Sequence, residues 1–297
     1  MTKLYFSIAI PGAGKDYFYE NKLKDKGVVH ISSDKLREEM FGDVNDQSHN
    51  DLVFNEMMDR TVANLNASHD CYYNATNLNQ KRRIKFLNAL RDRVYVEFDA
   101  IALVFAIPFD TCVRRNLNRE RTVPSYAMDR MYKSFQAPAY CEGWSEIHFI
   151  HDEDNRVNLV RQINDLIKVS HDNHHHSLTI GNHMIAAQDY AIKHDFPSEV
   201  REAALFHDIG KGSTKVFTDS KGRESQEAHY FFHANVSAYD YITAVAATFY
   251  NIEVANLIQL HMAFYEGENR LRNIKNLYGE DFFKKLKMLH ECDEAGH

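Results

Sequence analysis

The hydrophobic pattern of the first half of the chain alternates between short apolar runs and stretches with helical spacing. The apolar run at 98–107 is long enough and apolar enough to be a buried parallel strand. Proline is favoured in the first turn of a helix, so Pro108 and Pro124 are each expected to open one. The pattern therefore predicts a doubly wound α/β sheet. The expected strands are 3–10, 28–31, 71–73, 98–107 and 147–150, and the expected helices are 15–26, 34–42, 49–67 and 79–93.

After about residue 170 the strand pattern disappears and helical spacing continues. A polar segment, 170–176, is the expected linker, and 215–222 is expected to form a loop between two helices. Two domains also suit a chain of 297 residues. We predict an α/β domain over 1–169 and an all-α domain over 170–297. The helices expected in the second domain are 177–194, 198–208, 226–248, 251–265 and 279–294.

Composition narrows the class of protein. No apolar run approaches the roughly 20 residues of a membrane helix, and the N-terminus leads into a strand rather than a signal peptide. The four cysteines form no paired motif, which favours reduced thiols and a cytoplasmic location without a membrane partner. A net charge of −7 argues against indiscriminate nucleic-acid binding. Two local basic groups stand out: Lys81, Arg82, Arg83 and Lys85, and Arg114, Arg115, Arg119 and Arg121.

A glycine-rich loop follows the first expected strand. The phosphate-binding pattern is G-x-x-x-x-G-K-[ST]; Gly14 and Lys15 match it, whereas Ala9 and Asp16 depart from it. Backbone N–H groups at a helix N-terminus bind phosphate oxygens, and Lys15 would neutralise the β- and γ-phosphates. Taken alone, such a match suits a plain glycine turn equally well. The expected nucleotide-binding residues are Pro11, Gly12, Ala13, Gly14, Lys15 and Asp16.

Asp16 stands where a hydroxyl residue normally ligates Mg²⁺. Its carboxylate faces the nucleotide phosphates, and two like charges 4 Å apart repel by about 4 kcal/mol at a surface-like dielectric. We therefore expect Asp16→Ser to tighten Mg-ATP binding and to raise any kinase rate. The alternative is that Asp16 points away, or ligates the ion directly in a rebuilt site, and that Asp16→Ser leaves activity unchanged or lowers it.

Three further segments of the first half carry a resemblance to a known family. They are Ser33-Asp34-Lys35-Leu36-Arg37, Asn74-Ala75-Thr76-Asn77-Leu78-Asn79, and Arg115-Asn116-Leu117-Asn118-Arg119 followed by Val123-Pro124. Together with the loop, they make residues 3–151 resemble the phage-type polynucleotide kinases, a family of P-loop phosphotransferases. Asn74 stands where that family more usually has Asp.

The resemblance implies ATP or another NTP as phosphate donor, with Mg²⁺ in the kinase domain. It assigns Asp34 as general base on a 5′-hydroxyl acceptor, although Asp34 is also suited to cap a helix. It assigns Arg37 to the acceptor's phosphate. Arg115 and Arg119, four residues apart, are expected on one helix face, stabilising the transferring phosphoryl group. The candidate catalytic residues are Lys15, Asp34, Arg37, Arg115 and Arg119.

The second half contains Phe206-His207-Asp208-Ile209-Gly210-Lys211, with His183 upstream and Asp293 downstream. This order resembles the HD domains of bacterial tRNA nucleotidyltransferases and related phosphohydrolases, over about 174–297. The resemblance implies a divalent metal held by His183, His207, Asp208 and Asp293; these donors suit Mn, Ni, Co, Fe, Zn or Mg. It also implies hydrolysis by metal-activated water. Lys211, His233 and His261 are candidates for holding the substrate phosphate or a second metal.

Together, the two signatures predict a bifunctional enzyme that heals nucleic-acid ends. It would phosphorylate a 5′-hydroxyl end with an NTP, and remove a 3′-phosphate or 2′,3′-cyclic phosphate with a metal. Phage and bacterial RNA repair pair a kinase with a phosphatase domain in this way. The expected partners are RNA or DNA ends, RNA being favoured, and an RNA ligase that joins them; the two basic groups would form a local strand-binding surface.

Two other interpretations remain open. In the first, the HD domain hydrolyses free nucleotides and the P-loop half is a nucleotide-sensing regulator; the Asp34 and Arg37 pair argues against it. In the second, the P-loop half is a binding module that holds RNA or a partner for the HD domain, and Ala9 and Asp16 are its support.

Overall fold

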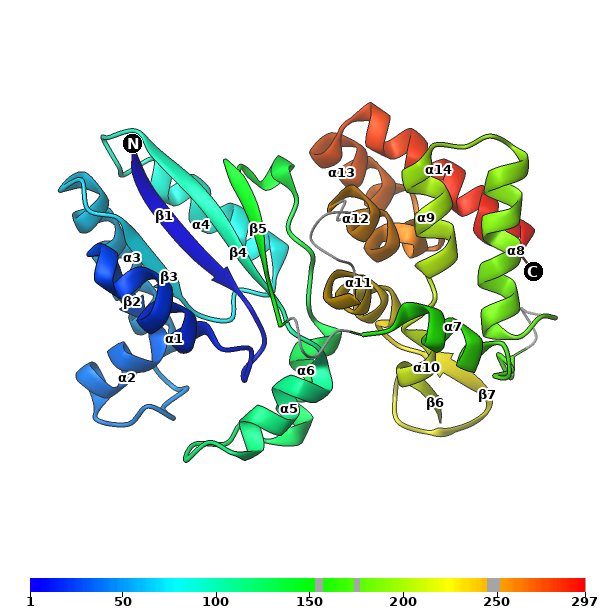
Figure 1. The fold of residues 1–297 in the computed structure, drawn as a ribbon, viewed down its shortest axis with the longest axis horizontal. Helices are drawn as coiled ribbons and strands as arrows, with labels where there is room; N and C mark the ends of the chain where they lie inside the picture. Colours follow the sequence, from blue (N-terminus) through cyan, green and yellow to red (C-terminus); the bar gives the residue numbers. More distant parts are fainter. Residues whose placement is uncertain (153–156, 174–176, 245–251, 297) are drawn as a thin grey trace. The chain divides into compact units, whose positions relative to one another are not determined.

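The computed structural model describes residues 1–152, 157–173, 177–244 and 252–296 (Figure 1). Contacts group the chain into two compact units. The first unit comprises 1–128 and 138–152, and the second comprises 129–137 and 153–297. No helix among the described residues is long and apolar enough to cross a membrane.

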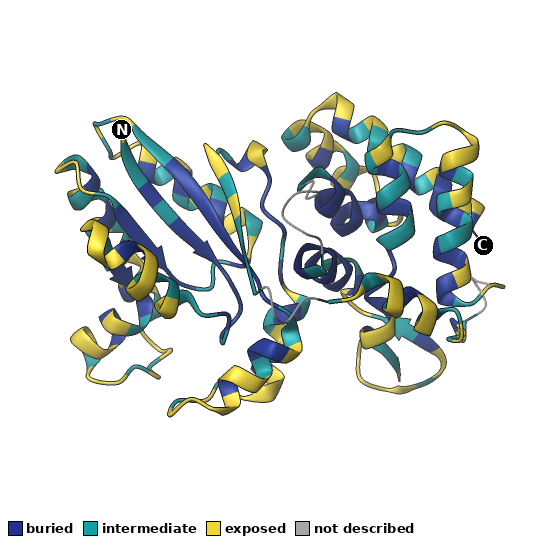
Figure 2. Ribbon diagram, viewed as in Figure 1, coloured by how far each residue is buried: buried dark blue, intermediate teal, exposed yellow. Residues whose placement is uncertain are grey.

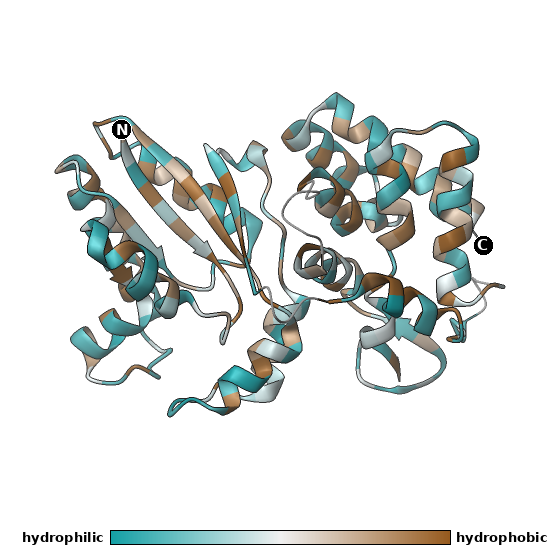
Figure 3. Ribbon diagram, viewed as in Figure 1, coloured by the Kyte–Doolittle hydropathy of each residue, from teal (hydrophilic) through white to brown (hydrophobic). Residues whose placement is uncertain are grey.

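The first unit is built on a parallel sheet, as the sequence predicts. Its five strands have the order β2-β3-β1-β4-β5. The central strands β1 and β4 are buried along most of their length, because both lie inside the sheet and carry long apolar runs (Figures 2 and 3). The strands are β1 (Thr2–Ile8), β2 (Val29–Ser32), β3 (Cys71–Asn74), β4 (Phe98–Ala106) and β5 (Glu146–His151).

The helices of this unit follow the predicted segments, with one difference. The stretch expected as one helix at 15–26 is α-helical only at its start and then continues as π and 3-10 turns, ending at Gly27 with φ 72°. The elements are α1 (Lys15–Phe18), η1 (Tyr19–Leu23), η2 (Lys24–Lys26), α2 (Ser33–Phe41), α3 (Asn50–Asn66), α4 (Gln80–Arg91), α5 (Phe109–Leu117), α6 (Ser125–Lys133) and η3 (Tyr140–Glu142). Helix α6 belongs to this unit only at its start, because its residues from 129 onward are part of the second unit.

The second unit is helical, as predicted, with one small antiparallel hairpin. The prediction of a helix from residue 226 is wrong, because 224–230 pairs with 215–218 across a turn in which Gly222 has φ 77°. The helix there begins at His233, and positions 245–248 of the prediction lie outside the described residues. The hairpin strands are β6 (Lys215–Thr218) and β7 (Glu224–Tyr230). The helices are α7 (Leu159–Leu166), α8 (Ile180–Lys193), α9 (Ser198–Phe206), α10 (Lys211–Thr214), α11 (His233–Ala244), α12 (Ile252–Leu260), η4 (His261–Tyr265), α13 (Glu268–Tyr278) and α14 (Glu280–Ala295).

Two segments outside 170–297 pack into this second unit. Helix α7 contributes Ile163 and Leu166 to a cluster with α8. The segment 129–137 packs on α11 and α12: the ring of Phe135 lies 4.9 Å from that of Tyr239, and Ala137 N donates to Gln259 Oε1 at 2.6 Å. The two units are defined by which segments pack together, whereas the boundary expected at residue 170 was placed from the composition of the sequence. The linker expected at 170–176 includes 174–176, which lie outside the described residues.

Candidate active sites

The phosphate-binding loop connects β1 to α1, and its glycines are required by the backbone. Gly12 and Gly14 have φ 81° and 90°, a region that favours glycine. A Cβ at Gly12 would lie 2.3 Å from the carbonyl oxygen of Cys112, so a side chain there would force the loop away from α5. Burial lowers the pKa of the Lys15 ammonium, and the charges of Asp16 and Asp34 offset part of that effect. The loop therefore places Lys15 in the field of both carboxylates.

Asp16 is held by a partner from β3. Asn74, at the end of that strand, donates from Nδ2 to Asp16 Oδ1 at 2.7 Å. The same Nδ2 lies 2.9 Å from His30 Nε2, and burial lowers the pKa of His30 to about 4. His30 is therefore neutral near pH 7 and accepts the second hydrogen of Asn74. The two bonds fix the Asn74 amide and direct the Asp16 carboxylate toward the end of β3.

Asp34 lies in the first turn of α2 without capping it. The cap is Ser32, whose Oγ accepts from Lys35 N at 3.4 Å. The Asp34 carboxylate instead accepts from Arg37 Nη1 and Arg121 Nη1, each at 3.0 Å, and its side chain remains 46% exposed. A substrate can therefore reach this carboxylate. The sequence did not single out Arg121 as a site residue; its only signal was membership of a basic group.

The two arginines expected over the phosphates do not share a helix face, so that prediction is wrong. Helix α5 ends at Leu117, and Arg119 lies in the following turn. The helix ends there because the Asn116 side chain bonds both backbone groups of Val123, at 2.8 and 2.9 Å, and folds the chain back. Arg115 remains on α5 and forms an ion pair with Asp152 at 2.6 Å. Arg119 is exposed, and its charge acts on Lys15.

In the second unit, four predicted ligands converge from two helices and the turn after a third: His183 on α8, His207 and Asp208 after α9, and Asp293 on α14. All four are buried. The Nε2 atoms of His183 and His207 lie 3.1 Å apart, and each lies 3.1–3.5 Å from an oxygen of Asp208 and of Asp293. Ligands about 2.1 Å from a tetrahedral ion are about 3.4 Å from one another. The four donors therefore have the spacing of a metal cage.

A second group shares Asp208. Its Oδ1 lies 3.3 Å from His233 Nε2 and 3.6 Å from His261 Nε2, and these two nitrogens are 3.2 Å apart. Oδ2 of the same carboxylate faces the first group. One carboxylate therefore faces both groups, which is an arrangement that can hold one or two divalent ions.

The imidazoles of both groups are held in one tautomer by the backbone. The Nδ1 atoms of His183, His207, His233 and His261 each lie 2.7–3.0 Å from a carbonyl oxygen, of Gly296, Ala204, Tyr230 and Ile258 respectively. A carbonyl only accepts, so each Nδ1 carries a hydrogen and each Nε2 is the ring atom that faces the group. Four ring nitrogens and two carboxylates directed at one space are a donor set for cations.

The charges around Asp208 also favour a bound cation. Burial raises the pKa of Asp208, but Lys211 and His207 lower it further, so the pKa lies well below its usual range. Lys211 Nζ is 2.6 Å from Oδ2, yet neither Asp208 oxygen has a regular hydrogen bond among the described residues. Burial and the neighbouring charges of His207 and His233 lower the pKa of His261 to about 3, so its ring is neutral. A buried carboxylate faced by imidazole nitrogens on both sides fits a bound divalent metal.

Comparisons with known families assign both units. Residues 8–138 match the family model described as AAA domain, and residues 174–295 match the family model described as HD domain. The chain joins an AAA domain to an HD domain. The AAA domain is kinase-like and implies a nucleotide and Mg²⁺, and the HD domain is metal-dependent. A search of curated proteins gave no match.

Solved structures give weaker likenesses. A protein from Chloroflexus aurantiacus described as a kinase is 14% identical, covering 50% of this chain and 84% of that one, with a TM-score of 0.42. The Pnkp1/Rnl/Hen1 RNA repair complex is 17% identical over 45% of this chain and 43% of that one, with a TM-score of 0.40. A fungal RNA kinase is 15% identical over 56% and 44%, with a TM-score of 0.39. At these values the likenesses imply nothing about substrate.

The basic group at 81–85 in the AAA domain exposes fewer charged side chains than its sequence suggests. Arg83 is buried, and its guanidinium binds both oxygens of Glu142 at 2.7 Å. It also donates to the carbonyls of Asn77 and Leu78, so it holds the segment that follows β3. Lys81, Arg82 and Lys85 are exposed. Arg83 is therefore a structural residue, and the exposed part of this basic group consists of its three neighbours.

Proposed function

We propose that this protein heals nucleic-acid ends with two active sites, a 5′-hydroxyl kinase in the AAA domain and a 3′-end phosphohydrolase in the HD domain. The main support for the kinase activity is Asp34. Its carboxylate is accessible, does not cap its helix, and lies near enough to the Lys15 ammonium for its charge to raise the pKa of that group. RNA is the favoured substrate, because phage and bacterial RNA repair pair a kinase with a phosphatase domain in this way.

In the kinase step, the phosphate-binding loop and Lys15 hold the β- and γ-phosphates of the nucleotide. Asp34 accepts the proton of the 5′-hydroxyl, whose oxygen forms a bond to the γ-phosphorus. The bond from that phosphorus to the β–γ bridging oxygen breaks, and the nucleoside diphosphate leaves. Lys15 and Arg119 stabilise the charge on the transferring group, and Arg37 holds the acceptor strand. Mg²⁺ would supply further charge neutralisation there, and Asp16 is the residue placed to hold it.

The contact between Asp16 and Asn74 supports an active kinase rather than a relic. The usual arrangement has a hydroxyl in the loop and a carboxylate after β3. Here the loop has the carboxylate and β3 has the amide, and the two touch at 2.7 Å. The exchange keeps one carboxylate in the same small volume. We therefore infer that Asp16 takes over the metal-binding role, which is the second of the two expectations for this residue.

In the HD domain, His183, His207, Asp208 and Asp293 would hold one divalent ion, and Asp208, His233 and His261 a second. Such ions supply a Lewis acid and lower the pKa of water to about 7. Water adds to the phosphorus of the 3′-phosphate, and the bond from that phosphorus to the 3′-oxygen breaks. A proton of the water passes to the 3′-oxygen, so that inorganic phosphate and a 3′-hydroxyl are released. Lys211, buried beside Asp208, would neutralise charge on the phosphate.

The kinase half is tested by titrating ATP binding, and then measuring transfer of its γ-phosphate to a 5′-hydroxyl oligonucleotide of RNA or DNA. We expect binding and transfer, faster to RNA. ATP binding without phosphate transfer to either acceptor would indicate that the AAA domain is a regulator of the HD domain. If the protein bound the oligonucleotide but not ATP, the AAA domain would be a binding module. Either of these results would overturn the kinase half of the proposal.

A further inference from the structure

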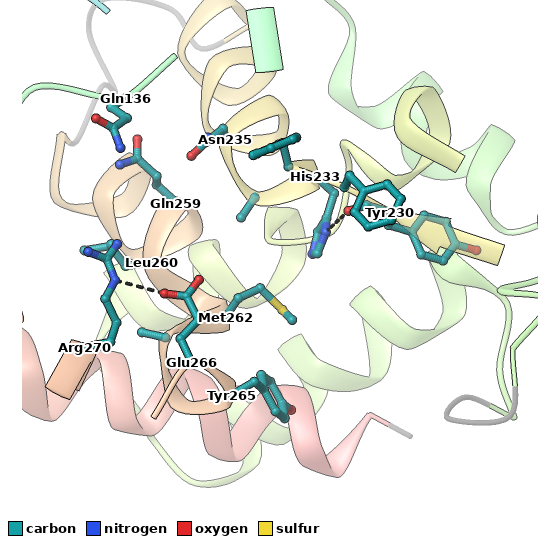
Figure 4. A pocket seen from close by; sticks show the side chains of 14 residues that line it. Gln136, Tyr230, His233, Asn235, Gln259, Leu260, Met262, Tyr265, Glu266 and Arg270 are labelled. Atoms are coloured by element: carbon teal, nitrogen blue, oxygen red, sulfur yellow. Dashed lines mark hydrogen bonds and ion pairs between the residues drawn. The ribbon is translucent and has the colours of Figure 1, made fainter. Parts of the chain in front are cut away.

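A pocket of about 510 Å³ lies beside the second metal group of the HD domain (Figure 4). His233 belongs to both: it lines the pocket, and its Nε2 lies 3.3 Å from Asp208. The other walls come from the end of β7, from α12 and η4, from the start of α13, and from Gln136 in the segment that packs on α11. The volume suits a small organic ligand, and the shared histidine puts that ligand next to the phosphate chemistry.

Two phenylalanines line this pocket and remain open to solvent. Phe231 is 37% exposed and Phe232 is 63% exposed. Phe232 has φ 64°, a left-handed backbone that a bulky side chain rarely adopts. Its carbonyl accepts from Asn235 N and Val236 N at the start of α11, and this fixes the turn that places His233. An exposed ring on a strained turn gains nothing from packing, so a ligand-binding role explains it better than a structural one.

Another part of the pocket lining is polar but uncharged. Figure 4 shows Gln136, Asn235 and Gln259 gathered there, away from Tyr230. Asn235 Nδ2 donates to Lys133 O at 2.9 Å, and Gln259 Oε1 accepts from Ala137 N at 2.6 Å. These bonds orient both amides and direct one acceptor, Asn235 Oδ1, and one donor, Gln259 Nε2, to other partners. Aromatic rings with side-chain amides are the groups by which proteins bind single bases.

The charges of the pocket favour the base over the phosphate as its occupant. Its one arginine, Arg270, is paired with Glu266 at 3.0 Å, so this pair adds no net positive charge. The positive charge of the HD site lies instead at Lys211, on the other side of Asp208. We propose that the pocket binds the nucleobase of the terminal nucleotide while its 3′-phosphate lies at the metal groups. The proposal rests on the phosphohydrolase function proposed above, and it makes the HD site selective for nucleotide ends over simple phosphate esters.

Phe232 is the residue to test, because glycine there preserves the backbone. Phe232→Gly removes the ring and suits φ 64°, so the variant is expected to fold at least as stably as the wild type. Phe217, which is 47% exposed on β6 and does not line the pocket, provides the control Phe217→Gly. Phe232→Trp keeps an aromatic face and should retain function.

The experiment compares two substrates on the full-length protein loaded with Mn²⁺: adenosine 3′-monophosphate, and p-nitrophenyl phosphate, which has no base. Stacking on one aromatic ring contributes about 5- to 150-fold in affinity per base. We expect Phe232→Gly to raise KM for the nucleotide by at least 5-fold, with kcat/KM for p-nitrophenyl phosphate within twofold of the wild type. Phe217→Gly and Phe232→Trp should change neither. An unchanged KM for the nucleotide, or an equal loss on both substrates, would overturn the proposal.

Binding separates failure of the pocket from failure of the proposed function. If the wild type hydrolyses neither substrate with any of the candidate metals, the phosphohydrolase function fails. Equilibrium dialysis of adenosine 3′-monophosphate then tests the pocket alone. Weaker retention by Phe232→Gly than by Phe217→Gly would support base binding, and equal retention would overturn it.

Discussion

The two candidate active sites differ in how far the folded chain fixes them before a ligand binds. In the HD domain the metal-facing side chains are buried, and a backbone carbonyl holds each imidazole. In the AAA domain Asp34, Arg115 and Arg119 are accessible to solvent, whereas Arg37 is buried, and most of these charged groups are paired. Asp34 binds Arg37 and Arg121, and Arg115 binds Asp152. The first site is preformed, whereas in the second a substrate phosphate must displace carboxylates from arginines.

Because of this difference, mutations in the two sites should differ in their effects on stability and on activity. A buried ligand contributes to folding and to metal binding at once, because removing it leaves its partners without charge balance. An accessible arginine contributes mainly to the reaction, since an exposed ion pair adds at most about 1 kcal/mol to stability. Changes in the HD groups should therefore alter both stability and activity, and changes in the kinase site should alter activity alone.

The largest effect is expected at Asp208, which faces both metal groups. Asp208→Asn should lower 3′-phosphatase activity by about 10³-fold or more, because it removes the shared carboxylate that would hold the ions. Kinase activity should stay within a few-fold of the wild type, since the ligands belong to a separate compact unit. His194→Ala, an exposed histidine at the end of α8, is the control and should change neither activity. Loss of both activities in Asp208→Asn would mean that the halves share one site.

Asp208→Asn also has a readout that does not depend on activity. A metal at 100 times its Kd stabilises the folded protein by about 2.7 kcal/mol. For a unit of this size that is a rise of roughly 5–10 °C in Tm. Mn²⁺ should raise Tm of the wild type by this amount and Tm of Asp208→Asn by much less. An equal rise in both would contradict the assigned ligands.

The next effect concerns the kinase site. Lys15→Ala, Asp34→Ala and Arg119→Ala should each lower 5′ phosphorylation by about 10²- to 10³-fold, as expected for groups that stabilise a developing charge or activate the acceptor. Thermal unfolding should show little change. Lys22→Ala, an exposed lysine of the same helical stretch, is the control. If Asp34→Ala kept most of its rate under conditions where chemistry limits turnover, the assigned base would be wrong.

Two adjacent arginines on α4 sharpen the contrast between buried and exposed charge. Arg83→Met should lower the free energy of unfolding by about 3–5 kcal/mol, because Glu142 is left buried without its partner. Arg82→Met, at an exposed position, should change it by less than about 0.5 kcal/mol. Denaturant unfolding followed by circular dichroism measures both. Equal values would place Arg83 at the surface, contrary to the structure.

The smallest effect tests the exchange between Asp16 and Asn74. Asp16→Ser should weaken Mg-ATP binding by about tenfold, which corresponds to about 1.4 kcal/mol, and should leave ATP binding without Mg²⁺ nearly unchanged. The double variant Asp16→Ser/Asn74→Asp moves the carboxylate back to β3 and should recover most of the loss. Titration calorimetry with and without Mg²⁺ on the wild type, Asp16→Ser and the double variant gives the six affinities. Tighter Mg-ATP binding by Asp16→Ser alone would restore the first expectation, in which the charge only repels the phosphates.

Features that depend on short sequence patterns could be predicted, whereas features that depend on contacts between distant segments could not. The alternation of strands and helices predicted the parallel sheet, and the His-Asp doublet predicted a metal group whose other ligands lie on distant helices. The contact between Asp16 and Asn74 could not be predicted, because it depends on which strand ends meet. The end of α5 before Arg119 depends on one side chain, Asn116, bonding residue 123. Residues 226–230 were predicted as the start of a helix but belong to the strand 224–230, because its alternation is short and only the pairing with 215–218 selects it.

The central claim is that one chain carries two independent chemistries for nucleic-acid ends. One oligonucleotide tests it directly: an RNA with a 5′-hydroxyl and a 3′-phosphate, incubated with ATP, Mg²⁺ and Mn²⁺, and both ends of the product determined by mass spectrometry. The wild type should give a 5′-phosphate and a 3′-hydroxyl. Lys15→Ala should change only the 3′ end, and Asp208→Asn only the 5′ end. If the wild type left either end unchanged, or if one substitution abolished both reactions in a folded protein, the claim would be contradicted.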